Sequence, residues 1–171
     1  MSDLWDEVGE SRVPLRLREN KVRITGIAKN KDGAPVLNQN EKDGHKYWSV
    51  AVALEEVDGP GSAIEFFGLK KNEAFKIMAT NKALGLTKDD LRKACAGKTA
   101  LPGKDDPPHA EFPQDTFEAI VDLWTGKEAE VYVYWDSYGG NYPKVSFVGR
   151  PKEDRIDKAK MGEGGGNEVP I

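Results

Sequence analysis

The chain has 171 residues, of which 38% are hydrophobic and 32% charged, and its formal net charge is −4. This composition is typical of one water-soluble globular domain, and no apolar run approaches the roughly 20 residues of a membrane span. The acidic N-terminus lacks the basic start and apolar stretch of a secretory signal, so we expect a cytoplasmic protein that does not enter a membrane. The single cysteine, Cys95, excludes an internal disulfide and a multi-cysteine metal site.

Charge is distributed unevenly along the chain. Residues 21–104 hold 15 Lys and Arg against 10 Asp and Glu, whereas residues 105–136 hold 1 against 9. A basic body with an acidic segment is compatible with an anionic partner, despite the negative net charge. One hypothesis is that the acidic segment competes for the basic face or contacts a partner.

The first elements in chain order are an arm and three strands. Residues 1–20 show no clean period and are expected to form an arm, with Trp5, Leu15 and Leu17 packing back onto the body. Residues 28–44, rich in Asn, Asp and Gly, are expected to form a long loop or an elongated hairpin tip. The segments that alternate apolar and polar side chains, as half-buried strands do, are 21–27, 45–57 and 62–69.

The alternation also assigns faces to the strands. In the second strand it places Trp48 toward a core and Tyr47 outward. In the third it separates Phe66 from Phe67, and we take Phe67 to face outward.

Helical spacing begins at Asn72. Phe75 and the residues that follow it at helical spacing predict an apolar face, and the helix ends at Gly85. A second helix begins after Thr87, because Asp90 three residues later completes a capping box.

The next segments complete the predicted order. Residues 96–113 hold four prolines and are expected to form an irregular excursion, and a third helix follows over 114–126. Its apolar stripe, which we expect to pack in the core, consists of Phe117, Ile120, Val121 and Trp124. Two further strands are expected at 129–136 and 142–149, joined by a glycine turn.

Three strands, a helical insertion and two strands give the order of a five-stranded Greek-key barrel, the OB fold. The predicted fold class is therefore mainly β with inserted helices, arranged as an OB-like barrel. A split α+β sheet with the same order is the alternative. The expected organisation is an N-terminal arm (1–20), the OB-like domain (21–149) and a disordered, glycine-rich C-terminal tail (150–171).

The sequence offers little for catalysis. Its two histidines, His45 and His109, lie in separate predicted loops without metal-ligand spacing, and no nucleophile or phosphate-loop motif is present. We therefore expect a protein that is not an enzyme, without catalytic residues, cofactor or metal.

Binding is better supported, because aromatic residues crowd the last predicted hairpin, "VYVYWDSYGGNYPKVSFV". Tyr132 and Tyr134 are expected to point away from the core, and Tyr138 and Tyr142 flank the turn. Single-stranded nucleic acids stack bases on such rings, beside Lys and Arg that contact phosphates. The alternative is that tyrosine pairs across the strands only stabilise the hairpin.

Several segments resemble a family of bacteriophage and prophage proteins that bind single-stranded DNA with an OB-type core. They are "VALEEVDGPGSAIEFF", "NKALGLT" and "LWTGKEAEVYVYWDSYGGNYPKVSFV", and the likeness covers about residues 21–149. The resemblance implies a role in phage DNA replication or recombination in the cytoplasm of a bacterial host. Tails in this family often end in acidic residues followed by Ile-Pro-Phe, which recruit replication and recombination proteins. This chain ends "NEVPI", with one acidic residue before the apolar trio and no terminal aromatic.

The leading hypothesis is a non-catalytic protein that binds single-stranded DNA largely independently of sequence. The expected DNA-binding residues are Lys21, Arg23, Lys46, Tyr47, Phe67, Lys70, Lys71, Tyr134, Tyr138, Tyr142 and Lys144, and the expected partner-binding tail is Glu168, Val169, Pro170 and Ile171. The alternatives are a protein-interaction or assembly module that uses the aromatic hairpin as its interface, and an RNA-binding OB protein. Whether the protein forms a homo-oligomer is left open.

Overall fold

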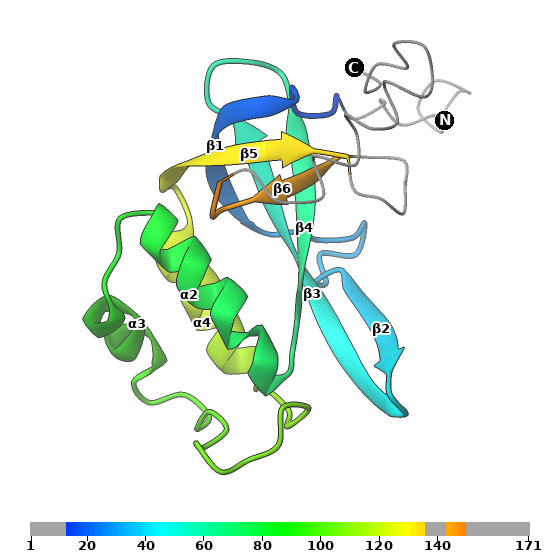
Figure 1. The fold of residues 1–171 in the computed structure, drawn as a ribbon, viewed down its shortest axis with the longest axis vertical. Helices are drawn as coiled ribbons and strands as arrows, with labels where there is room; N and C mark the ends of the chain where they lie inside the picture. Colours follow the sequence, from blue (N-terminus) through cyan, green and yellow to red (C-terminus); the bar gives the residue numbers. More distant parts are fainter. Residues whose placement is uncertain (1–12, 136–142, 150–171) are drawn as a thin grey trace.

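The computed structural model describes residues 13–135 and 143–149. Within these residues the protein is mainly β, with helices gathered at one end of a strongly bent antiparallel sheet (Figure 1). The strands are β1 (Arg18–Ile27), β2 (Leu37–Lys42), β3 (His45–Glu56), β4 (Ser62–Gly68), β5 (Glu128–Tyr134) and β6 (Lys144–Ser146). A 3₁₀ turn, η1 (Lys71–Glu73), leads into the helices α2 (Ala74–Ala83), α3 (Lys88–Cys95) and α4 (Gln114–Trp124).

The long strand β3 organises the sheet. One edge of β3 pairs first with β2 and then with β1, and the other edge pairs with β4. β1 continues the sheet to β5, and β5 pairs with β6. Among the described residues no pairing joins β4 to β6, so the sheet is not closed into a barrel by hydrogen bonds. The prediction of a mainly β fold with inserted helices is confirmed at this coarser level.

The predicted hairpin tip at residues 28–44 contains a strand of its own. β2 and the first half of β3 form a ribbon that projects beyond the rest of the sheet (Figure 1). Asp43 and Gly44 connect them with φ values of 53° and 80°, the left-handed backbone that a tight two-residue hairpin turn requires. This Asp-Gly turn fixes the register that pairs Lys42 with His45.

The core lies between the sheet and the helices. Phe67 on β4 packs against Phe117 and Trp124 of α4, with ring centroids 5.4 and 5.5 Å away. All four residues of the predicted apolar stripe of α4 are buried, as expected from their helical spacing. Leu15 of the arm is also buried in the core, as predicted, whereas Trp5 lies outside the described residues.

The capping box at the start of α3 is confirmed. The Asp90 amide donates to Thr87 Oγ1 over 3.2 Å, and the Thr87 amide donates to Asp90 Oδ2 over 2.8 Å. The Thr87 amide, and then the Thr87 hydroxyl, which also donates to Asp90 Oδ2, lower the pKa of Asp90 because they stabilise its charged form.

The predicted face of α2 is wrong. Phe75 is 86% exposed, and the buried residues of the helix are Ile77, Thr80 and Asn81. The helix turns its polar residues inward because Asn81 accepts a hydrogen bond from the buried indole of Trp124, at 3.1 Å. Hydrophobic spacing alone does not reveal this polar contact.

Three predicted strand faces are also wrong. Phe67 is 1% exposed, so it is a core residue and has no surface on which a base could stack. Trp48 is 47% exposed, although its parity matches the buried Val50, and it lies on the part of β3 that pairs with β2. Tyr132 is buried, and its hydroxyl accepts a hydrogen bond from Arg18 Nη1 at 3.0 Å.

Candidate nucleic-acid interface

The candidate interface lies where the projecting ribbon meets the segment that follows β4. We call it the β3 site, and its residues are Lys42, His45, Lys46, Tyr47, Trp48, Lys70, Asn72, His109 and Glu111. They come from three separate parts of the chain: the β2–β3 hairpin, the residues after β4, and the loop before α4.

The loop before α4 is held against the end of β4 by its main chain. The Lys71 amide donates to the Ala110 carbonyl at 2.8 Å, and the Phe112 amide donates to the Leu69 carbonyl at 3.1 Å. Lys71 Nζ also donates to the Lys104 carbonyl at 2.7 Å. The loop that the sequence predicts as an irregular excursion therefore has a defined position beside the sheet.

This docking brings the two histidines together. The His45 and His109 rings are stacked, with centroids 3.7 Å apart and planes 9° from parallel. His45 opens β3 and His109 belongs to the docked loop, so the stack connects the hairpin to the loop. Both side chains are exposed at the surface of the site.

Two adjoining grooves make up the site. One has a volume of about 280 Å³ and the other of about 270 Å³, and they share Lys46, Tyr47 and His109. Trp48 lines the second groove and is 47% exposed.

The lysines of the site are not paired with carboxylates of the described residues. Among the described residues, none of Lys42, Lys46 and Lys70 forms an ion pair. Lys70 Nζ instead lies 4.0 Å from the centroid of the Tyr47 ring, a cation–π contact. The carboxylates that line the two grooves are Asp43 and Glu111.

The predicted DNA-binding residues lie in several parts of the structure. Three of them, Lys46, Tyr47 and Lys70, meet in the β3 site, and Lys71 lies next to it with its ammonium bound to loop carbonyls. Tyr134 and Lys144 face each other across β5 and β6, in another part of the sheet. Lys21 lies on β1 within 3.6 Å of Glu128. The remaining calls, Tyr138, Tyr142 and the tail residues 168–171, lie outside the described residues.

Arg23 is occupied by carboxylates. Its two terminal nitrogens contact Glu55 Oε1 at 3.0 Å and Glu128 Oε2 at 2.7 Å. The hydrogen bond to Glu128, followed by the bond to Glu55, raises the pKa of Arg23, and the same contact lowers the pKa of Glu128. The β1–β5 surface therefore offers less free positive charge than its sequence suggests.

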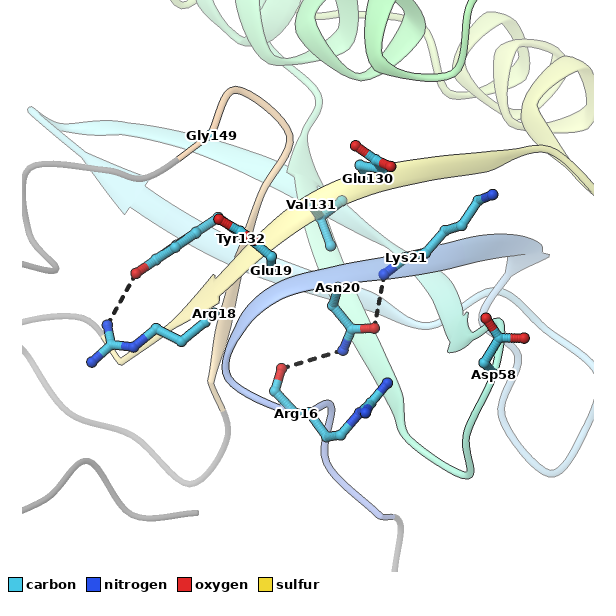
Figure 2. Close-up of a pocket in the computed structure, with 10 residues that line it drawn as sticks. All are labelled: Arg16, Arg18, Glu19, Asn20, Lys21, Asp58, Glu130, Val131, Tyr132 and Gly149. Carbon is cyan, nitrogen blue, oxygen red and sulfur yellow. Dashed lines mark hydrogen bonds between the residues drawn. The ribbon is translucent and has the colours of Figure 1, made fainter.

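A further cleft lies along β1 and β5 (Figure 2). Its volume is about 920 Å³, and its walls come mainly from β1 and β5. Its basic residues, Arg16, Arg18 and Lys21, are matched by Glu19, Asp58 and Glu130. Among the described residues that line it, the charges are balanced and the one tyrosine is buried, whereas nucleic-acid sites combine exposed aromatic rings with an excess of cations.

Among the described residues of the acidic segment, Glu111 is the one carboxylate that lines the grooves. Glu111 lines the groove beside Trp48, whereas Asp106 accepts from the Gly103 amide within its own loop. Asp115 accepts from the amide and hydroxyl of Thr99, which lowers its pKa. The hypothesis that the acidic segment competes with an anionic partner for the basic face therefore concerns Glu111 first.

Sequence reasoning missed six residues of the β3 site, which are Lys42, His45, Trp48, Asn72, His109 and Glu111. Trp48 occupies the same alternating positions of β3 as the core residues. The sequence signal against its burial is its closeness to the Asp-Gly turn, because the end of a hairpin extends beyond the core. No local signal places residues 109–111 beside β3, because that proximity depends on tertiary pairing.

No family model matches this sequence, and a comparison with curated proteins finds no match either. Within the described residues, no helix is both long and apolar enough to cross a membrane. The same residues contain no cluster of three His, Cys, Asp or Glu side chains placed to hold a metal ion.

Proposed function

We propose that the protein binds single-stranded DNA through the β3 site, without catalysis and largely without sequence preference. The observation that carries this proposal is the meeting of an exposed tryptophan, a half-exposed tyrosine and three lysines without ion pairs in adjoining grooves. A role in phage DNA replication or recombination rests on the sequence resemblance alone.

The chemistry of the site suits a flexible, unpaired strand. A base stacked on an exposed aromatic ring contributes about 1 to 3 kcal/mol, and every base offers such a face. Lysines that neutralise phosphates add a salt-dependent contribution through counterion release. In the β3 site Trp48 supplies the exposed ring, while Lys42 and Lys46 supply the charge.

Strand pairing supports an OB-like interpretation of the sheet. β1 pairs with both β3 and β5, and the series β4–β3–β1–β5–β6 has the helices inserted between its β4 and β5 members. An OB barrel is partly open and binds oligonucleotides on its second and third strands, which correspond to β3 and β4 here. The β3 site lies at that position.

The test is fluorescence anisotropy with a labelled oligo-dT of about 30 nucleotides, titrated at low and moderate salt and repeated with duplex DNA and with oligo-U. Salt-sensitive binding to single-stranded DNA, with little binding to duplex, is expected. Preference for oligo-U would assign the site to RNA. No binding to any strand at low salt would contradict the proposal and favour a protein-interaction module.

A matched pair of variants tests whether the β3 site is the DNA-binding surface. Trp48→Ala is expected to weaken binding about fivefold to a hundredfold, the range that one stacked base supplies. Phe75→Ala removes another exposed aromatic, outside the β3 site, and is expected to leave affinity unchanged. Equal effects of the two variants would show that the β3 site is not the interface.

A further inference from the structure

We infer that the groove around His45 and His109 is a phosphate subsite whose occupation is coupled to protonation of the histidine pair. This inference rests on the proposed function, because the phosphate is taken to belong to a bound DNA strand. It adds a specific subsite and a pH dependence, which the stacking and lysine argument does not require.

The geometry of the groove is suited to an anion. It is lined by three lysines, Lys42, Lys46 and Lys70, by both histidines and by Asn72, against one acidic residue, Asp43. The groove volume of about 280 Å³ accommodates a phosphate group with its bridging atoms. Donors from three separate segments therefore converge on one space.

The stacking of the histidines makes their protonation depend on what the groove holds. At a centroid separation of 3.7 Å, a positive charge on one ring opposes a positive charge on the other. The lysines add to this opposition. A phosphate in the groove offsets the repulsion, so binding of the anion favours uptake of protons by the pair.

The charged groups that face the pair come from every neighbouring segment. They are Lys42 and Asp43 at the hairpin turn, Lys46 on β3, Lys70 after β4, and Glu111 in the docked loop. Among these side-chain types, histidine is the one whose ordinary pKa lies between pH 6 and pH 8.

The first measurement is the affinity for oligo-dT at about pH 6 and about pH 8, at constant ionic strength, for the wild-type chain and for His45→Gln combined with His109→Gln. Wild-type affinity is expected to rise about threefold to tenfold at the lower pH. The double variant is expected to lose most of that rise, so that the ratio of its affinities at the two pH values is close to one. Circular dichroism at both pH values checks that the variant is folded.

The second measurement follows the imidazoles directly by NMR. The chain contains two histidines, so their ring resonances report on this pair alone. Adding oligo-dT is expected to move their titration to higher pH. Inorganic phosphate serves as the comparison, and a shift with phosphate but none with oligo-dT would assign the groove to free phosphate and overturn the DNA subsite.

The outcomes separate the two proposals. Oligo-dT binding of equal strength at both pH values, or an unchanged pH dependence in the double variant, would overturn the subsite and leave the proposed function intact. Absence of oligo-dT binding at either pH would contradict the proposed function itself.

Discussion

Lys70 Nζ lies 4.0 Å from the ring centroid of Tyr47. Tyr47 belongs to β3, and Lys70 follows the end of β4. The two strands pair as far as Ser49 and Gly68, each two residues from this contact. Although Lys70 is only 8% exposed, no carboxylate among the described residues pairs with it. The cation is thus fixed at the groove by an aromatic ring rather than by an opposite charge, and its charge remains available to a phosphate.

Removing this cation should weaken DNA binding and its salt dependence. For Lys70→Gln we expect a lower affinity for oligo-dT, and a plot of log affinity against log salt whose slope falls by about 0.7, the value of one phosphate contact on a single strand. The measurement is anisotropy at four or more salt concentrations. Lys82→Gln, at the exposed end of α2, removes the same charge outside the site and should change neither quantity. An unchanged slope in Lys70→Gln would show that Lys70 contacts no phosphate.

Glu111 is the carboxylate of the acidic segment that lines the groove beside Trp48. Because a carboxylate repels phosphate at close range, Glu111→Gln should increase affinity for oligo-dT, and the gain should shrink as salt rises. Asp122→Asn, on the exposed face of α4, is the matched control from the same acidic segment. Equal gains from both variants would indicate a general effect of net charge. No gain from Glu111→Gln would remove the competition hypothesis.

The sequence predicts best where a local signal is sufficient. The capping box of Thr87 and Asp90 and the apolar stripe of α4 depend on neighbouring residues, and both are confirmed. Alternation also marks β1, β3, β4 and β5, whereas β2 lies in a segment expected to be a loop or hairpin tip. The orientations of Trp48 and Phe67 fail for a tertiary reason: burial depends on which part of a strand the helices cover.

The candidate site is only partly predictable for a related reason. Lys46 and Tyr47 are neighbours in the sequence, and Lys70 reaches them through one strand pairing. The stack of His45 on His109 requires the docked loop, whose position is set by main-chain bonds at Lys71 and Phe112. Main-chain hydrogen bonds place no requirement on the type of side chain, so the sequence contains no signal that the two histidines lie together.

Arg23 should contribute to stability rather than to DNA binding. Its contact lowers the pKa of Glu128. A carboxyl whose pKa is lower in the folded state stabilises the folded protein at pH values above its unfolded pKa, which is about 4.5 for Glu128. That stabilisation is lost as the pH falls through the lower, folded value. The melting temperature of Arg23→Gln should therefore be below that of the wild type at neutral pH, and the difference should shrink in acid.

Thermal unfolding from about pH 3 to pH 7 measures this difference. Arg92→Gln is the control, because Arg92 pairs with Asp89 at 2.8 Å on an exposed helix surface, where ion pairs contribute little. A difference between Arg23→Gln and wild type that is constant with pH would contradict the assigned cause. Oligo-dT affinity of Arg23→Gln should stay near that of the wild type, since its guanidinium is already bound to two carboxylates.

Asn81 should be important for stability because it connects three elements while 1% exposed. Its Oδ1 accepts from Trp124 Nε1 at 3.1 Å, and its Nδ2 donates to the Thr87 carbonyl at 3.0 Å. Asn81→Ala would leave the buried indole N–H without its acceptor, which costs about 1 to 3 kcal/mol. The free energy of unfolding from urea titration should fall by that amount, with an unchanged dependence on urea concentration.

Asn38→Ala is the matched control for Asn81, because Asn38 is exposed on β2 and the change should fall within about 0.5 kcal/mol of wild type. The indole of Trp124 is buried in the core, and Trp124 is not among the described residues that line the grooves of the β3 site. Well below its melting temperature, Asn81→Ala should therefore bind oligo-dT as the wild type does. A loss of affinity in the folded variant would mean that the α2–α4 contact also positions the loop that carries His109. Wild-type stability would instead show that the indole finds another acceptor.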